Sequence, residues 1–398
     1  MAKRDLVRLL HRARANTDHL FTLVRSESLY ERPIPERHRL IFYLGHLEAF
    51  DWNLIADKTL GLPSRHAAFD RLFAFGIDPD SRSLPQDKPS DWPGEIQVRQ
   101  YNDEVRRELD TALANIPDQR LHVAIEHRLM HAETLAYLLH NLPYEKKNRG
   151  DASETRPVVS EARYGVPDGS AEIPAGETTL GRRSGDGFGW DNEFEEHTVH
   201  VPAFAISRRK VTNGEYLEYV RTGAAAPHFW VLRGREYFYR GMFTEIPLPL
   251  DWPVYVTHDE ASAYAAWKGK DLPSESQFHR AAYPAANGSA HAPDFSQENV
   301  DFRNWDPVSV DATPSNAFGV CQMVGNGWEW TSTVFHPFPG FQPFSFYPGY
   351  SADFYDGQHY VLKGGSPRTA ACMLRPSFRN WFRPSYPYLY STFRLVEN

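Results

Sequence analysis

The chain changes character near residue 150, and this change constrains its fold more than any other feature. In residues 1–143, apolar side chains recur at helical spacing. From about Ala171 onward, Gly, Pro, Asn and Asp are frequent and the apolar runs are short. A chain of 398 residues is also too long for one ordinary hydrophobic core. The sequence therefore predicts an α+β protein with a helical domain at 1–150 and an irregular α+β domain at 171–398.

Four long helices are expected in the first domain, because its apolar side chains return at intervals of three and four residues. Four long antiparallel helices form a bundle. The helices are expected over residues 6–24, 36–58, 95–115 and 118–141. The polar stretch 151–170, which contains Pro and Gly, is expected to link the bundle to the second domain. Two shorter helices are expected in that domain, at 258–268 and 274–282.

Charge and composition exclude several classes of function. The net charge of −8 leaves no basic face for nonspecific binding of nucleic acid. No segment approaches about 18 consecutive apolar residues, so no membrane span is expected. Two cysteines, Cys321 and Cys372, cannot form a disulfide framework, which fits a reducing compartment. The sequence therefore predicts a cytoplasmic protein that binds neither nucleic acid nor membrane.

Three histidines of the predicted bundle form a candidate metal site. His127 and His131 are four residues apart, so both imidazoles lie on one helix face, where they can bind one metal ion. His46 lies midway along the second helix. Three imidazoles would leave coordination positions open, as an O2-activating iron requires, but the same ligands also suit zinc. With 17 histidines in the chain, and His122 and His140 on the same helix, the pairing could also have arisen by chance.

Four short motifs characterise the second domain. They are Leu-Pro-Ser-Glu at 272–275, Gly-Asn-Gly-Trp-Glu-Trp at 325–330, Gly-Gly-Ser at 364–366 and Phe-Arg-Leu at 393–395. In this order they resemble the formylglycine-generating-enzyme/sulfatase-modifying family, which implies that family's irregular α+β, C-type-lectin-like fold. Most of these residues are expected to serve the fold, including glycines that permit tight backbone geometry.

The reactive cysteine pair of that family is missing. Formylglycine-generating enzymes carry two cysteines shortly after Gly-Gly-Ser, whereas Thr369 and Leu374 occupy those positions here. Cys372 is a single cysteine out of register. Formylglycine formation needs two thiolates to hold copper, so the sequence argues against this activity.

The combination of the two domains is more informative than either one. A DinB-like bundle with this histidine pattern, fused to the second domain, resembles the ergothioneine-biosynthesis sulfoxide synthases and the related selenoneine synthases. The resemblance covers nearly the whole chain. It implies that His46, His127 and His131 hold Fe(II), with O2 as co-substrate. It also implies an oxidoreductase that attaches sulfur or selenium to the imidazole ring of hercynine, which is trimethylated histidine.

One segment of the second domain is expected to bind the substrate. The family's Arg-Asn-Trp segment corresponds to Arg379, Asn380 and Trp381. The resemblance implies that Asn380 bonds the hercynine carboxylate or imidazole. Trp381 would pack against the trimethylammonium group, a cation–π contact suited to a quaternary amine. The branch that uses γ-glutamylcysteine has an acidic residue next, whereas this chain has Phe382, so γ-glutamylcysteine is not the expected donor.

The proton donor is a second difference from that branch. Its catalytic tyrosine precedes Gly-Gly-Ser, where Phe344 or Phe346 stand here, and Tyr347 is the candidate nearby. The branch that uses cysteine places its tyrosines in the bundle, where this chain has Leu72 and Phe73. A donor without a free thiol needs such a phenol less. The sequence therefore favours a selenosugar donor and selenoneine synthesis.

Three alternatives remain open at this point. The chain could be a sulfoxide synthase that uses cysteine or γ-glutamylcysteine. It could be a zinc enzyme of the DinB type that acts on thiols, with the metal on the same histidines. It could also be a binding module without activity, because domains of the second type occur in that role.

Overall fold

The computed structural model describes residues 2–64, 66–74, 85–148, 164–284 and 295–397. The chain divides into two compact units, Met1–Ser153 and Glu154–Asn398. Most of the expected linker, residues 151–163, lies outside the described residues, and Ser170 is already the first residue of a strand. None of the described helices is long and apolar enough to cross a membrane.

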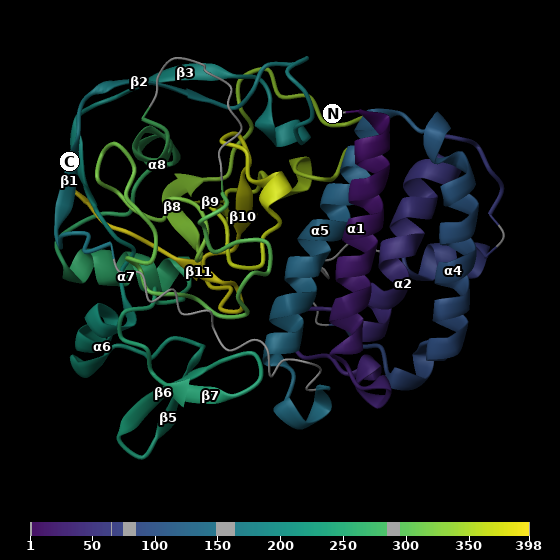
Figure 1. The fold of residues 1–398 in the computed structure, drawn as a ribbon, viewed down its shortest axis with the longest axis horizontal. Coiled ribbons are helices and arrows are strands. Elements are labelled where there is room, and N and C mark those ends of the chain that lie inside the picture. The colour runs from purple at the N-terminus through teal and green to yellow at the C-terminus, as the bar shows by residue number, and fades with distance from the viewer. Residues whose placement is uncertain (1, 65, 75–84, 149–163, 285–294, 398) are drawn as a thin grey trace. The chain divides into compact units, whose positions relative to one another are not determined.

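The first unit contains the expected bundle of long helices (Figure 1). They are α1 (Lys3–Thr22), α2 (Leu40–Asp51), α4 (Glu95–Ala112) and α5 (Asp118–Asn141), with the short helix α3 (Ala67–Leu72) before α4. Helix α1 packs on α5, and α2 packs on both α4 and α5. The apolar stripes that predicted these helices face one another in the core, where Leu6, Leu10, Val98 and Leu121 are fully buried.

The second of these helices differs from the prediction at both ends. A helix was expected over 36–58, but α2 begins only at Leu40, after the extended residue Arg39. Its continuation, Trp52–Asp57, is a π-helix, with hydrogen bonds such as that from the Lys58 N–H to the Asn53 oxygen. The spacing of apolar residues does not distinguish a π-helical turn from an α-helical one. π-Helical turns are frequent at functional sites.

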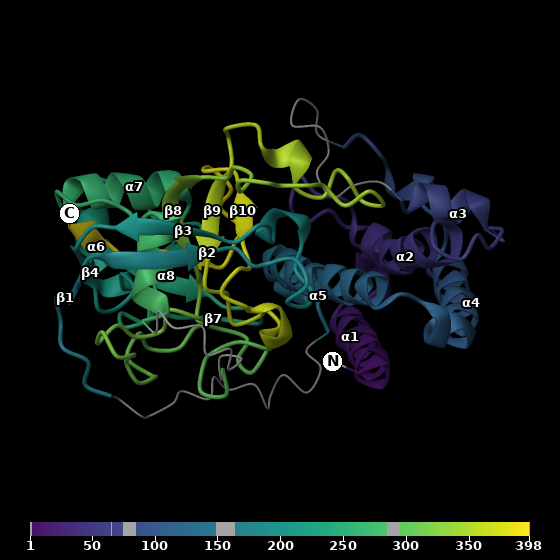
Figure 2. The same cartoon turned by 90° about the horizontal axis from the view of Figure 1, so that it is seen from above.

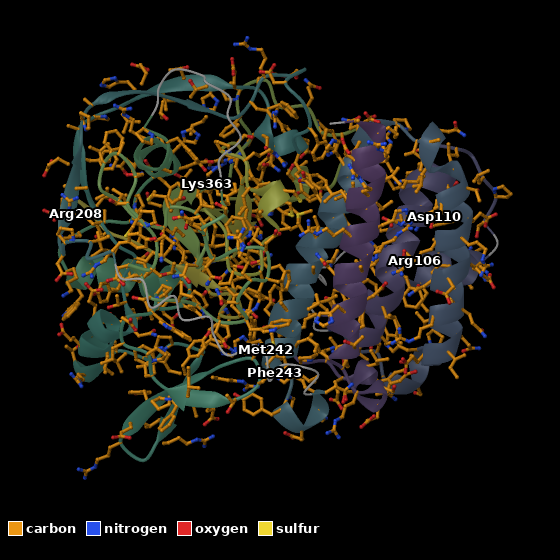
Figure 3. All side chains as sticks on the ribbon, in the orientation of Figure 1. Arg106, Asp110, Arg208, Met242, Phe243 and Lys363 are labelled. Atoms are coloured by element: carbon orange, nitrogen blue, oxygen red, sulfur yellow. The ribbon has the colours of Figure 1, made fainter. Side chains whose placement is uncertain are left out.

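A buried ionic cluster joins the helices of the bundle. Arg128 of α5 is fully buried, and its guanidinium donates to Glu48 at 2.7 Å and to Asp51 at 2.8 Å, both on α2. Arg106 of α4, which Figure 3 labels, also bonds Glu48, at 2.6 Å, and bonds Asp18 of α1 at 2.7 Å. A buried charge is tolerated only when it is paired. The cluster therefore fixes the register in which these helices meet.

The second unit is built around a four-stranded sheet in the order β10–β9–β8–β11. Its strands are β8 (Trp328–Val334), β9 (Tyr360–Lys363), β10 (Asn380–Phe382) and β11 (Ser391–Thr392). Strand β9 is antiparallel to both β8 and β10, and β11 runs parallel to β8. Three smaller sheets are described besides it. One contains β1 (Ser170–Ile173), β4 (Phe204–Ser207) and β12 (Val396–Glu397), and a second contains β2 (Gly176–Leu180) and β3 (His197–Val201). The third contains β5 (Trp230–Arg233), β6 (Glu236–Arg240) and β7 (Glu245–Pro247).

The α-helices described in this unit are α6 (Asn213–Arg221), α7 (His258–Trp267) and α8 (Glu275–Ala282), all labelled in Figure 2. The bounds of α7 and α8 confirm the two expected helices to within one residue. Helix α6 was not expected, although Thr212 and Glu215 form a capping box, in which each side chain bonds the other residue's N–H. The same type of box begins α7 and α8, so this signal could have found all three.

The signature motifs of the second unit lie in its core. Glu329 of β8 is fully buried, at 2.6 Å from Lys210 and 2.7 Å from Arg394. Gly364 has a φ of +94°, and a Cβ there would lie 2.8 Å from the main-chain oxygen of Met323, so only glycine fits. These residues serve the scaffold, as the sequence predicts.

Candidate metal centre and substrate residues

Three buried imidazoles come together inside the first unit. His46 of α2 and His127 and His131 of α5 are each at most 3% exposed. The ring centroids are 5.3 Å apart for His46 and His127, 4.9 Å for His46 and His131, and 4.5 Å for His127 and His131. One ring nitrogen of each residue lies within 4.8 Å of the others, which is close enough for a single metal ion.

Helix geometry and aromatic packing explain this arrangement. One helical turn separates His127 from His131, so both side chains leave α5 on one face. Phe50 stacks on the His127 ring with centroids 3.4 Å apart, and Phe42 stacks on the His46 ring at 4.8 Å. Both phenylalanines come from α2, so the helix that carries His46 also restrains the His127 ring of α5. Rings packed in this way lose rotamer freedom before any ligand binds.

Most ring nitrogens of this cluster lack a hydrogen-bond partner in the part of the chain that the structure describes. Nδ1 of His46 lies 2.6 Å from the main-chain oxygen of Phe73. Nε2 of His46, Nδ1 of His127 and both nitrogens of His131 have no partner among the described residues. A buried polar atom that is left unsatisfied costs about 1–3 kcal/mol. Unpartnered nitrogens gathered within bonding range of one point therefore fit a metal ion.

Burial also keeps the three imidazoles neutral. Removal from water lowers the pKa of His46 to about 4. The same cause holds the pKa values of His127 and His131 well below the usual range, and the neighbouring imidazoles and Arg128 further oppose a positive charge there. A neutral imidazole is the form that binds a metal, so the cluster is ready to do so at neutral pH.

Asn380, Trp381 and Phe382 make up β10 of the second unit. The half-buried indole of Trp381 stacks on Phe335, with centroids 4.3 Å apart and planes 6° apart, and its neighbour Tyr350 lies at 5.5 Å. The side-chain oxygen of Asn380 accepts from the Trp381 N–H at 2.9 Å. Successive side chains of a strand point to opposite faces. Asn380 and Phe382 therefore share one face of β10, and Trp381 lies on the other.

Arg379 has different surroundings from the other three residues of its segment. Its guanidinium is 2% exposed and donates to Glu275 at 3.0 Å. It also donates to the main-chain oxygens of Asn192 at 3.3 Å and His336 at 3.0 Å, and it lies 4.0 Å from the ring centroid of Phe338. These contacts are all made within the protein, so they fix the backbone where β10 begins.

Tyr347 lies in a turn, where its N–H bonds the Phe344 oxygen at 3.0 Å. Its ring is 5.6 Å from that of Tyr350, which in turn contacts Trp381 at 5.5 Å. Burial raises the pKa of Tyr347 to about 12, and the nearby carboxylate of Asp191 adds to this effect. The phenol therefore keeps its proton at neutral pH.

The positions of the missing cysteine pair are occupied by packed side chains. Thr369 is buried, and its hydroxyl accepts from the Ser366 N–H at 2.8 Å. Leu374 is also buried, and it leaves so little room that a Cβ on Gly365 would lie 2.8 Å from its side chain. Cys372 is exposed and Cys321 is buried, and the two do not form a disulfide. This arrangement provides no pair of thiolates at the place where the formylglycine-generating enzymes have one.

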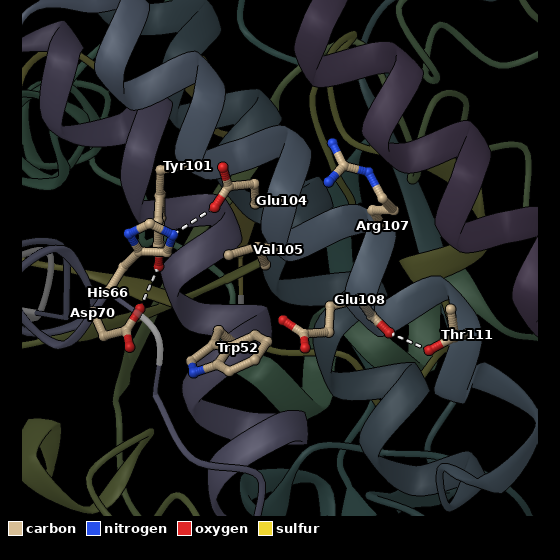
Figure 4. Close-up of a pocket in the computed structure, with 9 residues that line it drawn as sticks. All are labelled: Trp52, His66, Asp70, Tyr101, Glu104, Val105, Arg107, Glu108 and Thr111. Carbon is tan, nitrogen blue, oxygen red and sulfur yellow. Dashed lines mark hydrogen bonds and ion pairs between the residues drawn. The ribbon is translucent and has the colours of Figure 1, made fainter.

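A pocket of about 500 Å³ lies elsewhere on the first unit (Figure 4). Its wall contains two polar pairs, Tyr101 with Asp70 at 2.8 Å and His66 with Glu104 at 2.6 Å, and the indole of Trp52. None of the three clustered histidines lines it. No sequence motif predicts this pocket, because its wall combines α3 and α4 with the π-helix that follows α2.

Comparisons with known proteins agree with the division of the chain. The DinB superfamily model matches residues 9–145, and the sulfatase-modifying factor enzyme 1-like domain model matches residues 155–398. The protein named hercynine oxygenase from Mycolicibacterium smegmatis is 33% identical over 443 residues, which cover 100% of this chain and 99% of that protein. The chain belongs to the hercynine oxygenase family. This membership confirms the resemblance stated from the motifs of both domains.

Two fungal relatives are longer than this chain. The proteins named ergothioneine biosynthesis protein 1 from Neurospora crassa and Schizosaccharomyces pombe are each 29% identical to it, over 495 and 429 residues. Each match covers 94% of this chain but only 56% and 54% of the relative, so the chain spans about half the length of these proteins. Among solved structures, PvdO from Pseudomonas aeruginosa covers 57% of this chain and 93% of its own, with 22% identity and a TM-score of 0.43.

Proposed function

We propose that this chain is an oxidoreductase that uses O2 to form a carbon–chalcogen bond on the imidazole ring of hercynine. The observation that carries the proposal is the cluster of His46, His127 and His131, three buried neutral imidazoles with unpartnered nitrogens. The substrate class comes from the family, whose members include proteins named hercynine oxygenase and ergothioneine biosynthesis protein 1.

The three imidazoles would hold Fe(II). Iron with three protein ligands keeps open positions, and when bound it supplies the place where O2 and the chalcogen donor react. The imidazole set suits zinc as well. We favour iron because the relatives named oxygenase point to chemistry with O2, which zinc does not activate. The protein's own contribution would be to hold the reacting groups within bonding distance.

Hercynine would bind at β10 of the second unit. This strand is the edge strand of its sheet, so a ligand beside the edge can reach side chains of both faces. The indole of Trp381, held against Phe335, would receive the trimethylammonium group by a cation–π contact. Asn380 would bond the carboxylate or imidazole of hercynine. We assign Arg379 to the same site as a positioning residue, because its guanidinium is already bonded to Glu275 and to main-chain oxygens.

The chalcogen donor we propose is a selenosugar, which would make the chain a selenoneine synthase. Phe382 supports this choice, since its ring stacks on Tyr386 at 5.3 Å and offers no carboxylate to the amine of γ-glutamylcysteine. Tyr347 would be the proton donor, because its ring lies 5.6 Å from Tyr350, which contacts Trp381 of the proposed hercynine site. The alternative is an ergothioneine-type sulfoxide synthase that uses cysteine or γ-glutamylcysteine, the reaction class suggested by the names of the relatives.

The test is an aerobic reaction of the iron-loaded chain with hercynine, analysed by mass spectrometry. A selenosugar, cysteine and γ-glutamylcysteine are supplied in separate reactions. A selenium isotope pattern on hercynine, found only with the selenosugar, would support the proposal in full. A sulfoxide adduct with either thiol would refute the donor assignment and retain the reaction class.

The variant His131→Gln should lose both iron and turnover. His122→Gln is its matched control, because His122 lies on the same helix outside the cluster. Absence of an adduct with every donor would refute the proposal. Bound zinc with activity that persists without O2 would then favour a thiol transferase of the DinB type, and no activity at all would favour a binding module.

A further inference from the structure

The orientation of the His46 ring depends on one main-chain group. Nδ1 of His46 lies 2.6 Å from the Phe73 oxygen, and a carbonyl oxygen can only accept a hydrogen bond. In the neutral ring, Nδ1 must therefore carry the proton, and the lone pair is on Nε2. Nε2 has no partner among the described residues, so it is the nitrogen that this bond leaves available for a metal.

The Phe73 oxygen is available because it lies at the end of a helix. Phe73 is the residue that caps the C-terminus of α3, and the last carbonyl groups of a helix have no partner within it. The residue is well anchored, since its N–H bonds the Phe69 oxygen at 3.0 Å. Its side chain is fully buried, with Trp92 at 6.1 Å and Tyr101 at 6.2 Å in stacked orientation.

Gly45 provides the space in which the Phe73 ring lies. A Cβ at position 45 would be 2.6 Å from three carbon atoms of that ring. Gly45 lies inside α2, where its backbone is helical, so the need for glycine here is steric rather than conformational. Glycine inside a helix costs about 1 kcal/mol relative to alanine. Here glycine lets Gly45, the neighbour of His46, lie against the Phe73 ring. Phe73 is the residue whose main-chain oxygen bonds His46.

We propose that Gly45 and Phe73 are positioning residues that fix the tautomer and the direction of His46, so that Nε2 is the metal-binding atom. The inference rests on the three-histidine centre of the proposed function. Histidines that bind metals commonly donate their other ring N–H to a carbonyl or carboxylate, and loss of such a partner costs about 10- to 100-fold in metal affinity. A main-chain oxygen performs this role here, and its position depends on how the Phe73 side chain packs.

The first experiment measures Co(II) affinity of the full chain by competition with a chromophoric chelator. Gly45→Ala should weaken binding by about 10- to 100-fold, because the new methyl group displaces the Phe73 ring and moves its carbonyl. The double variant Gly45→Ala with Phe73→Leu should recover most of the affinity, since the smaller side chain admits the methyl group and keeps the carbonyl. Gly94→Ala is the control, because a Cβ at position 94 has only an ordinary contact, 3.6 Å from Gln97.

The second experiment observes the tautomer directly. Nitrogen NMR of histidine-labelled, metal-free chain should show the proton of His46 on Nδ1, with the signal assigned by its loss in His46→Gln. A proton on Nε2, or wild-type Co(II) affinity in a folded Gly45→Ala variant, would overturn the inference. Wild-type chain that binds no Co(II) would instead refute the metal centre of the proposed function, and the tautomer would still decide whether Phe73 holds His46.

Discussion

The metal-free protein should lose stability as the pH falls from about 6.5 towards 4, because its clustered histidines resist protonation while the chain is folded. Burial lowers the pKa of His46 from an ordinary value of 6.5 to about 4. Between these values the unfolded chain binds a proton at this residue and the folded chain does not. Acid therefore favours unfolding, and the stability that is present above pH 6.5 is lost as the pH falls through the folded pKa.

The size of this loss follows from the same two values. Each pKa unit corresponds to about 1.36 kcal/mol, so His46 alone should account for about 3 kcal/mol at about pH 4. The pKa values of His127 and His131 are lowered in the same direction by the same cause, and these residues should add to the loss. A loss of this size is a large fraction of the total stability of an ordinary domain, which is about 5–15 kcal/mol.

The assay is urea unfolding of the metal-free chain at several pH values between about 7 and 4, followed by circular dichroism. His46→Gln removes one of the titrating groups. The free energy of unfolding of wild type, measured relative to that of this variant, should therefore fall by about 3 kcal/mol between about pH 7 and pH 4. His122→Gln, on α5 but outside the cluster, should not show this convergence. Parallel pH curves for wild type and His46→Gln would refute the argument that burial in the cluster keeps His46 neutral.

Three further changes test other parts of the structure. Arg128→Met should reduce the free energy of unfolding by about 3–5 kcal/mol, because it removes the cation that bonds the buried Asp51 and leaves Glu48 with Arg106 alone. Arg99→Met, at an exposed ion pair, should change it by less than about 1 kcal/mol in the same denaturant titration. Trp381→Leu should raise the KM for hercynine about 5- to 30-fold through loss of a cation–π contact, whereas Trp381→Phe should preserve most of the affinity in steady-state assays. Tyr347→Phe should lower kcat about 10²-fold or more with little change in the KM for hercynine, and an unchanged kcat would exclude Tyr347 as the proton donor.

The helices of the bundle were predictable because their apolar spacing is a local property. The bounds of α5 follow from its sequence alone, and those of α7 and α8 nearly so. Among the features that the sequence did not predict, the π-helix after α2 and helix α6 were missed for different reasons. The π-helix after α2 conserves the apolar pattern of a helix, and only its hydrogen bonds distinguish it. Helix α6 begins with Asn213 and Gly214, which are typical of turns, although a capping box precedes them.

The candidate site was predictable only where its geometry is local. The spacing of His127 and His131 places them on one helix face without any knowledge of the fold. His46 was a candidate from its place midway along the second predicted helix. Because 81 positions, counted from 46 to 127, separate it from its nearest partner in the sequence, only the family resemblance implied that all three hold one ion. Asn380 and Trp381 were expected together, but their positions on opposite faces of β10 depend on strand formation there.

The bundle contains two groups of buried polar side chains, and the contrast between them shows how the site is supported. The cluster around Arg128 consists of opposite charges that pair with one another, since its guanidinium bonds both Glu48 and Asp51 between α5 and α2. The histidines on the same two helices are left with unpartnered nitrogens. Unsatisfied polar groups can persist at a functional site when the packing, hydrogen bonds and charges around them all favour the same fold. Arg128, the residue next to His127, thus ties α5 to α2, and these are the two helices that carry the three histidines.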